Sequence, residues 1–230
     1  MSSATDDGTV LVTGACGHIG RAVCRALIGV KRKILPVDVN PDKTEDVMVC
    51  DLRLMNDLSR LFQSRPISAV IHLAGVLPSA FQADPFAGAD VDLSGSLELM
   101  RQAAKARVTR FVFASSMSVY GSSSRPRPLT EDDPAMPDEP YGAAKRAVDL
   151  IGETLTNRGA IEFVTYAACG PTTDTRSFHL HGWFLAPILD CLCLECLRRE
   201  QPGAFSKFDG THVRNNALLP GVYSCGEVPF

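Results

Sequence analysis

Tyr141 and Lys145 stand four residues apart in the segment Tyr141-Gly-Ala-Ala-Lys145, which opens a stretch with the apolar spacing of a helix. Positions i and i+4 lie on one face of a helix, so the Lys145 ammonium is expected close to the Tyr141 phenol. Its positive charge would lower the pKa of the phenol. A phenol activated in this way can remove or return an alcohol proton while a hydride moves to or from a nicotinamide. The alternative interpretation of such a pair is a solvated helix face.

A cluster of serines precedes this pair in the chain. Ser115, Ser116 and Ser118 follow the apolar run Phe111-Val-Phe-Ala and belong to the segment Ser115-Ser-Met-Ser-Val-Tyr-Gly121. A hydroxyl at the end of a buried strand could hold a substrate alcohol against Tyr141. The residues by themselves leave open which of the three serines does so.

Three glycines, Gly14, Gly17 and Gly20, separate an apolar run that ends at Thr13 from a stretch with helical periodicity. In such a turn the first glycine permits a tight bend, the second lets a pyrophosphate approach the backbone, and the third lets helix and sheet pack closely. The helix N-terminus supplies N–H groups and a positive dipole end for the phosphates. A plain turn is the alternative, but strand, turn and helix occur in the order that dinucleotide binding requires.

Asp38 ends the second apolar run and follows Gly20 at close to the distance of about 20 residues expected for an acidic residue that binds ribose. Its carboxylate can accept hydrogen bonds from the adenosine ribose hydroxyls. It would also repel a 2′-phosphate, which favours NAD over NADP as the cofactor. The alternative is that Asp38 only caps a loop.

Continuous apolar runs alternate with amphipathic stretches over the first two thirds of the chain. We expect strands at 9–13, 34–38, 47–50, 69–75, 111–115 and 161–166, and helices at about 19–27, 56–62, 93–104 and 141–155. Strands that are apolar on both faces are typical of a parallel sheet covered by helices. An antiparallel α+β domain would instead show polar–apolar alternation and hairpin turns, which are not prominent. We therefore predict an α/β fold with a doubly wound parallel sheet of the Rossmann type.

The composition of the 230 residues excludes several classes of function. The formal net charge is −3 without a basic block, so a nucleic-acid partner is not expected. We expect no membrane association, because no apolar run reaches the length of about 20 residues that spans a bilayer. The N-terminal residues lack the features of a secretory signal, and eight cysteines without such a signal are typical of reduced thiols in a cytoplasmic protein.

The regular pattern weakens after about Ala167. We expect residues 1–171 to form a dinucleotide-binding domain and residues 172–230 a short C-terminal segment of poorly defined structure, with a helix at about 183–198. His179 and His181 precede Cys191, Cys193 and Cys196, a combination that raises the question of a zinc site. Thiols two residues apart on a helix point in different directions, so buried cysteines are favoured and no metal is expected.

These motifs, taken in order, resemble the short-chain dehydrogenase/reductase superfamily. More narrowly, the chain is similar to its extended NAD-dependent epimerase/dehydratases, which act on nucleotide sugars and related sugars. The resemblance covers roughly the first 170 residues. It rests on the glycine turn, Asp38, the serine cluster, the Tyr141–Lys145 segment, Asp51-Leu52 and His72-Leu-Ala-Gly75.

The resemblance implies a role for each matched position. Tyr141 would be the acid/base, Lys145 would bind the nicotinamide ribose and tune the tyrosine, and Ser116 aligns best with the catalytic hydroxyl of the family. Ser115 and Ser118 align less well. The cofactor would be NAD, bound by Gly14, Gly17, His18, Ile19, Gly20, Asp38, Asp51, Leu52, Leu73, Ala74, Gly75, Tyr141, Lys145 and Pro171.

Three departures from the family pattern stand out. Asp92, in Val91-Asp92-Leu-Ser-Gly95-Ser96, replaces an asparagine of the family and puts the network near the site in question. The sixth strand leads to Gly170-Pro171 without the Leu-Arg pair of the family. The residues after Pro171 are too few for the usual substrate-binding lobe.

The function implied by the resemblance is hydride transfer between NAD and a secondary alcohol of a sugar or nucleotide sugar, with Tyr141 moving the proton. Whether the reaction is an epimerisation, a dehydration or a plain oxidation, and on which sugar, stays open. Relatives also imply a homodimer formed through the Tyr/Lys helix. The alternative function is a catalytically impaired dinucleotide-binding protein with a truncated substrate lobe.

Overall fold

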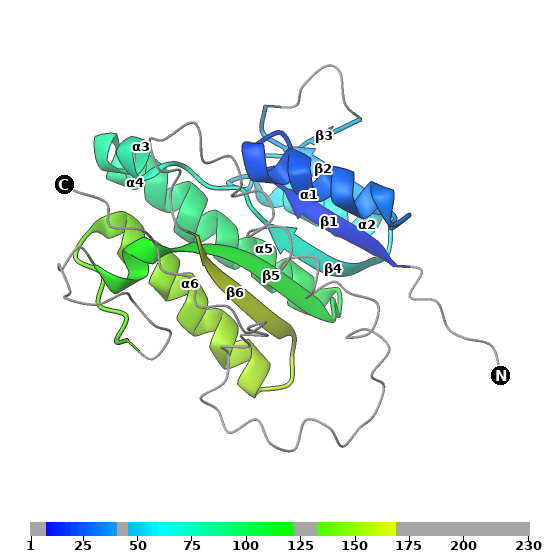
Figure 1. Ribbon diagram of the computed structural model, residues 1–230. Helices are drawn as coiled ribbons and strands as arrows, with labels where there is room; N and C mark the ends of the chain where they lie inside the picture. Colours follow the sequence, from blue (N-terminus) through cyan, green and yellow to red (C-terminus); the bar gives the residue numbers. More distant parts are fainter. Residues whose placement is uncertain (1–7, 41–45, 122–132, 169–230) are drawn as a thin grey trace, which may run out of the picture.

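The computed structural model describes residues 8–40, 46–121 and 133–168 of the chain. Six parallel strands form one sheet in the order β3-β2-β1-β4-β5-β6 (Figure 1). The strands are β1 (Thr9–Thr13), β2 (Ile34–Asp38), β3 (Met48–Val49), β4 (Ile67–His72), β5 (Arg110–Ser116) and β6 (Glu162–Ala168). This strand order is that of the dinucleotide-binding Rossmann fold, so the predicted fold class is confirmed.

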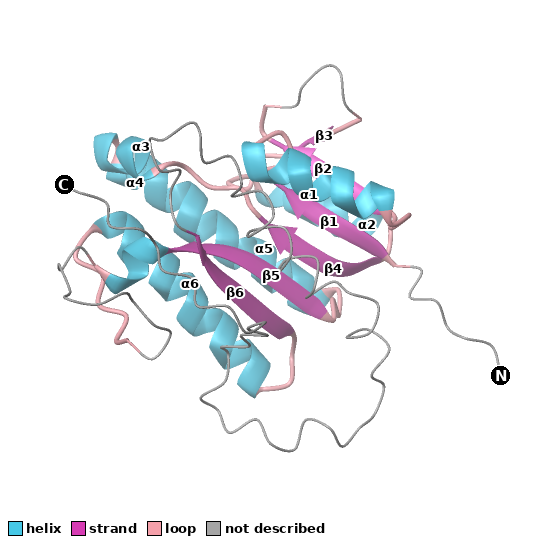
Figure 2. Cartoon of the chain, in the orientation of Figure 1, coloured by secondary structure: helices cyan, strands magenta, loops and turns pink. Residues whose placement is uncertain are grey.

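Helices connect the strands. They are α1 (His18–Gly29), α2 (Met55–Ser64), α3 (Pro78–Ala83), α4 (Pro85–Ala89), α5 (Ser96–Lys105) and α6 (Pro140–Asn157). A π-helical segment, η1 (Asp90–Gly95), leads directly into α5, and a 3-10 turn, η2 (Met117–Tyr120), follows β5. Figure 2 shows these helices flanking the sheet.

The core lies on both faces of the sheet because its strands are apolar on both faces. On one face Leu11, Val70 and Phe111 pack against buried residues of α2, α5 and α6. On the other face Val10, Val12 and Ile71 pack against Val23 and Leu27 of α1. Figure 1 shows α1 in front of the sheet and α5 and α6 behind it.

One expected helix differs from the structure. The apolar spacing from Leu93 to Ala104 predicts a single regular helix, whereas residues Asp90–Gly95 form the π-helical segment. Gly95 lies close to Leu52, because a Cβ at Gly95 would come 3.0 Å from the Leu52 Cβ. The wider turn carries Asp92 into the interior, where its side chain is fully buried. Segments of this kind are frequent at functional sites.

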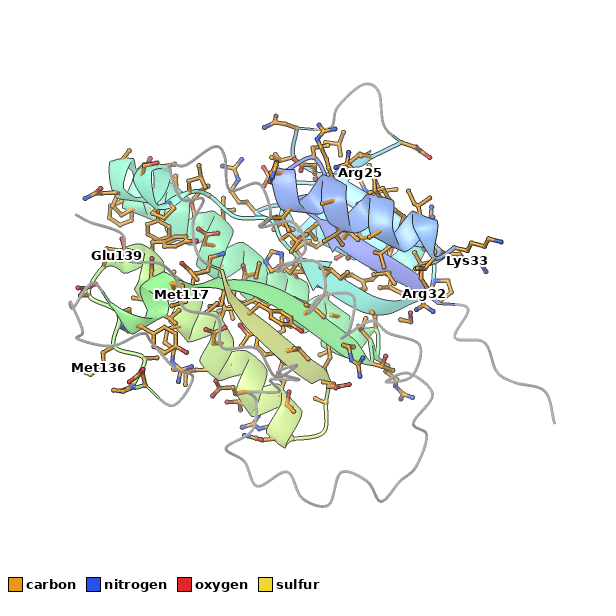
Figure 3. The ribbon with its side chains drawn as sticks, viewed as in Figure 1. Arg25, Arg32, Lys33, Met117, Met136 and Glu139 are labelled. Carbon is orange, nitrogen blue, oxygen red and sulfur yellow. The ribbon has the colours of Figure 1, made fainter. Side chains whose placement is uncertain are left out.

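The carboxyl ends of the parallel strands meet at one edge of the sheet, which is where open α/β sheets bind ligands. The glycine turn follows β1, Leu73 follows β4 and η2 follows β5 at this edge. Figure 3 shows Glu139, just before α6, at one end of the molecule, with Arg32 and Lys33, just before β2, at the other.

Several expectations fall outside the described residues. They concern Pro171, the C-terminal segment 172–230, the helix at about 183–198 and the histidine and cysteine cluster from His179 to Cys196. Within the described ranges, the helices are too short or too polar to cross a membrane.

Candidate active site

The glycine turn packs closely against neighbouring backbone, because two of its glycines stand where a Cβ would collide. Gly14 has φ +68°, a left-handed conformation that favours glycine, and a Cβ there would come 2.7 Å from the Ala74 N. A Cβ at Gly20 would collide with the Gly14 carbonyl, so close contact between α1 and the turn requires this glycine. His18 and Ile19 begin α1, whose first turn carries no acidic residue that would compete with a phosphate. The turn therefore has the form of a phosphate cradle.

Asp38 lies at the end of β2 beside this turn. Its carboxylate accepts hydrogen bonds from the Cys16 N–H at 3.0 Å and from the Asn40 N–H at 3.0 Å. The carboxylate thus links the end of β2 to the glycine turn, where the hydroxyls of a ribose would be expected.

The remaining predicted cofactor residues surround the same edge. Asp51 accepts hydrogen bonds from Arg53, which lower the pKa of the Asp51 carboxyl. Leu52 is buried in the core, whereas Leu73 and Ala74 are half-buried and Gly75 is exposed.

Ser116 and Tyr141 form the centre of the predicted acid–base site. Their side chains share a hydrogen bond, and the Ser116 hydroxyl also accepts one from the Ser118 N–H at 3.1 Å. The Tyr141 ring packs edge-on against Phe81 of α3, with ring centroids 5.9 Å apart. Ser115 differs, because its hydroxyl donates to the Asp149 carboxylate at 2.8 Å. Of the serines, the structure brings Ser116 to the phenol.

Lys145 is buried one helical turn beyond Tyr141. Its Nζ lies 5.6 Å from the centroid of the Tyr141 ring and 3.4 Å from Oδ1 of Asp92. It also donates a long hydrogen bond, 3.5 Å, to the Ala114 carbonyl. Lys145 and Asp92 are 5% and 0% exposed, so they form a buried ion pair.

The two motifs converge at Gly75. A Cβ at Gly75 would come 3.1 Å from the Lys145 Nζ and would collide with the Asp92 carboxylate, while Ala74 lies against Gly14 of the phosphate cradle. The short backbone segment 73–75 therefore lies between the glycine turn and the buried ion pair and contacts both.

The expected effect of Lys145 on Tyr141 is wrong for this structure. Burial raises the pKa of the phenol, and the negative charges of Asp92 and Glu139 raise it further, although the hydrogen bond with Ser116 lowers it. The main physical reason is the burial of the phenol, which disfavours its charged form. Burial lowers the pKa of the Lys145 ammonium, which the carboxylates of Asp92 and Asp149 oppose.

A chain of hydrogen bonds holds the backbone of Asp92. The Ser96 hydroxyl donates to the Asp92 carbonyl at 2.8 Å, and the two nitrogens of His72 bond Ser96 Oγ at 2.8 Å and Thr13 Oγ1 at 2.7 Å. Because Ser96 donates to Asp92, it accepts from His72 Nε2, and His72 Nδ1 accepts from Thr13. Burial lowers the pKa of His72 to about 3, so this histidine is neutral.

Asp149 is a second buried carboxyl below the site. It accepts hydrogen bonds from Ser115 at 2.8 Å and from Thr165 at 2.7 Å, and burial raises its pKa to about 6. Sequence reasoning missed this residue, although Tyr141, Lys145 and Asp149 follow one another at intervals of four. That spacing was the available signal. The contact between Asp92 and Lys145 had no comparable signal, because it joins distant segments of the chain.

Comparison with known families gives a match over most of the chain. The sequence model described as the NAD dependent epimerase/dehydratase family matches residues 10–186. Among curated proteins, the UDP-glucose 4-epimerase uge1 of Schizosaccharomyces pombe is 31% identical over 168 residues, which are 65% of this chain and 47% of that protein. A UDP-glucose 4-epimerase of Neisseria meningitidis serogroup B is 32% identical over 62% of this chain and 46% of its own. The chain spans about half the length of these relatives.

Solved structures give the same picture. UDP-glucose 4-epimerase of Thermus thermophilus, in complex with NAD, has a TM-score of 0.64 at 26% identity to this chain. The match covers 72% of this chain and 57% of the epimerase chain. MoeE5, in complex with UDP-glucose and NAD, has a TM-score of 0.60 at 32% identity and covers 70% of this chain and 53% of its own.

Proposed function

Since this chain belongs to the NAD dependent epimerase/dehydratase family, a family of enzymes, we propose that it transfers hydride between NAD and a secondary alcohol of a sugar or nucleotide sugar. The observation that carries the proposal is the convergence at Gly75. There the phosphate cradle lies next to Lys145, and the Ser116–Tyr141 pair lies one helical turn away. The UDP-glucose bound together with NAD in the MoeE5 structure supports a nucleotide sugar as the substrate class.

The described residues fit NAD. Gly14 and Gly20 let the turn lie close to Ala74 and α1 lie close to the turn, where a Cβ would collide with backbone, and α1 presents its N-terminus to the turn, so the pyrophosphate would lie against Gly17, His18 and Ile19. Asp38 would accept hydrogen bonds from the adenosine ribose, and Asp51 and Leu52 would flank the adenine. Leu73, Ala74 and Gly75 would line the path to the nicotinamide, with Lys145 on its ribose and Pro171 beside its ring.

When bound, NAD supplies the hydride acceptor. The other parts of the reaction belong to the chain. Ser116 holds the substrate hydroxyl, and Tyr141, in its phenolate form, takes the hydroxyl proton at the phenol oxygen that Ser116 contacts. Half-burial of Tyr141 and its contact with Phe81 keep water from the phenol on that side. In the reverse direction Tyr141 returns the proton to the carbonyl oxygen of the oxidised sugar.

Three broader features complete the proposal. Residues 1–171 form the cofactor-binding domain, and 172–230 contribute to the substrate side. The protein acts as a homodimer through α6, whose Leu150 and Ile151 are 47% and 42% exposed. The protein works in the reducing cytoplasm, which agrees with Cys16, Cys24 and Cys50 forming no disulfide among the described residues.

Replacing Tyr141 by phenylalanine tests the acid–base role. The wild-type protein is incubated with NAD⁺ and a panel of UDP-sugars, free uronates and simple sugars, and NADH absorbance and product stereochemistry are followed. We expect Tyr141→Phe to lose turnover by roughly a hundredfold or more while NADH binding, measured by fluorescence, is unchanged.

Thr154→Val on α6 is the control, because it removes an exposed hydroxyl from the same helix. A Tyr141→Phe protein with full rate would refute the assignment of the acid/base. A wild-type protein that binds NADH but turns over none of the panel would favour the alternative, a dinucleotide-binding protein without turnover.

A further inference from the structure

We infer that Asp92 is a positioning residue of the acid–base site, which holds the Lys145 ammonium in a buried ion pair beside Tyr141 and balances its charge. Removing the carboxylate of Asp92 should therefore make the phenol easier to ionise. This inference rests on the proposed function. It concerns the position at which the chain departs from the family pattern, Asp92 in place of an asparagine. The departure thus has a specific physical consequence.

The first argument is the geometry of the pair. Asp92 Oδ1 lies 3.4 Å from the Lys145 Nζ and also accepts the Val76 N–H at 3.2 Å. Gly75 lies so close to both side chains that a Cβ there would meet each of them. Lys145 is therefore held from three sides, by Asp92, by the Ala114 carbonyl and by the Phe113 ring, whose centroid is 5.0 Å away.

The second argument is that Asp92 depends on Lys145. Its side chain is fully buried, and Oδ2 has no hydrogen-bond partner among the described residues. A buried carboxylate without a partner is costly, so the Lys145 ammonium is what allows the charged form to persist there. The chain of hydrogen bonds through Ser96, His72 and Thr13 prevents the segment from turning Asp92 outward.

The third argument concerns every charged group around the phenol. Asp92 comes from η1, Glu139 from the residue before α6, and Lys145 and Asp149 from α6 itself, while His72 of β4 is neutral. Lys145 is the cation of this set, and Asp92 lies in direct contact with it. An asparagine at position 92 carries no charge. With asparagine there, the positive charge of Lys145 would act on the Tyr141 phenol without being balanced.

The test is the ionisation of Tyr141 in the protein without cofactor, followed by tyrosinate absorbance. The chain contains four tyrosines, so the signal of Tyr141 is obtained as the difference between each protein and its Tyr141→Phe counterpart. We expect Asp92→Asn to lower the pH midpoint of the Tyr141 ionisation by about one pH unit. Asp90→Asn is the matched control, because it removes an exposed carboxylate from the same segment and should leave the midpoint unchanged.

A double variant keeps the test informative if Asp92→Asn does not fold. Asp92→Asn with Lys145→Met removes both charges and leaves no unpaired charge buried. We expect the midpoint of Tyr141 in this variant to stay within a few tenths of a pH unit of the wild type, since the two charges balance each other. A rise of about one unit in the double variant, or no change in Asp92→Asn, would overturn the inference.

Activity gives an independent readout. In Asp92→Asn the pH profile of alcohol oxidation should move to lower pH by the same amount as the midpoint of Tyr141, and an unmoved profile contradicts the role of Asp92. If the wild-type protein neither binds NADH nor turns over a substrate, the proposed function fails. The titration without cofactor still decides whether Asp92 controls the phenol.

Discussion

Asp38 combines two contacts that bear on cofactor choice. One carboxylate oxygen holds the Cys16 N–H of the glycine turn and the other holds the Asn40 N–H of the following loop. The same group would meet the adenosine ribose of a bound dinucleotide. Its carboxylate therefore supports the shape of the turn, and in the proposed role its negative charge would also repel a 2′-phosphate.

Replacing Asp38 by alanine should change the preference for the cofactor. We expect NADH affinity to fall by about tenfold to a hundredfold, because hydrogen bonds to a charged group contribute roughly 1.5–3 kcal/mol, and NADPH affinity to hold or rise. Fluorescence titration with both dinucleotides measures the ratio of the two affinities.

Asp38→Asn separates charge from shape, since an asparagine oxygen can still accept the Cys16 N–H. The same shift toward NADPH is expected in that variant. An unaltered ratio in both variants would show that Asp38 does not read the ribose.

At the scale of elements, α6 carries the proposed acid–base residues along one stripe. Tyr141, Lys145 and Asp149 recur every four residues, which places them in line on the face toward the sheet. Gly142 and Gly152 allow this close approach, because a Cβ at Gly142 would collide with the Ser118 carbonyl and one at Gly152 with the Phe163 ring. Asp149 joins α6 to Ser115 of β5 and Thr165 of β6.

The buried Asp149 predicts a pH dependence of stability. Its pKa in the folded protein, about 6, lies above the ordinary value of 3.8, so the folded state binds the proton more tightly than the unfolded state. Its contribution to the free energy of unfolding should therefore fall as pH rises from about 4 to about 6, by an amount on the order of 3 kcal/mol. Asparagine does not titrate and removes this dependence.

Urea unfolding of the wild type and of Asp149→Asn between pH 4 and pH 8 measures the effect. Comparing the two proteins at each pH cancels the contributions of other titrating groups to the free energy of unfolding. One such group is His72, whose lowered pKa makes stability fall as pH drops below about 6.5. Asp90→Asn, which removes an exposed carboxylate, should give a constant difference. If the difference in the free energy of unfolding between the wild type and Asp149→Asn is equally constant over this pH range, the pKa of Asp149 is not raised in the folded protein.

On the scale of the whole molecule, the site is divided between the two halves of the sheet. The phosphate cradle and Asp38 come from β1, α1 and β2, whereas Ser116, Tyr141 and Lys145 come from β5 and α6. Strands β1 and β4 are neighbours in the centre of the sheet and join the halves. A dinucleotide that spans this boundary would tie both halves together in the folded state.

Binding of NADH should consequently raise the stability of the whole domain. At a hundred times its dissociation constant, NADH is expected to add about 2.7 kcal/mol to the free energy of unfolding, because it binds the folded chain alone. Thermal or urea unfolding with and without NADH measures this gain. NADPH at the same concentration should add less, and equal gains from both would contradict the role given to Asp38.

The sequence by itself determined the order of the strands and of the four longer helices α1, α2, α5 and α6, the glycine turn, the acidic end of β2 and the tyrosine–lysine pair on one helix, but not the short helices α3 and α4. These features depend on residue type and short spacing, which local geometry converts directly into structure. For the same reason the sequence also indicates Asp149, because Tyr141, Lys145 and Asp149 follow one another in steps of four residues. The sequence analysis overlooked this last residue.

Only the tertiary structure decided what charge the tyrosine meets. Asp92 reaches Lys145 through a π-helical segment that the apolar spacing does not reveal, and the pair is buried where water cannot screen it. The pKa of Tyr141 rises, mainly because the phenol is buried and further because of the negative charge of Asp92, although the spacing of Tyr141 and Lys145 predicts that it falls. Likewise, residue type and spacing alone leave the choice between Ser115 and Ser116 open, although the family resemblance favours Ser116. The packing of α6 against β5 brings Ser116 to the phenol and Ser115 to Asp149. The sign of an electrostatic effect depends on every charge within a few ångströms, and folding brings those charges together from distant parts of the chain.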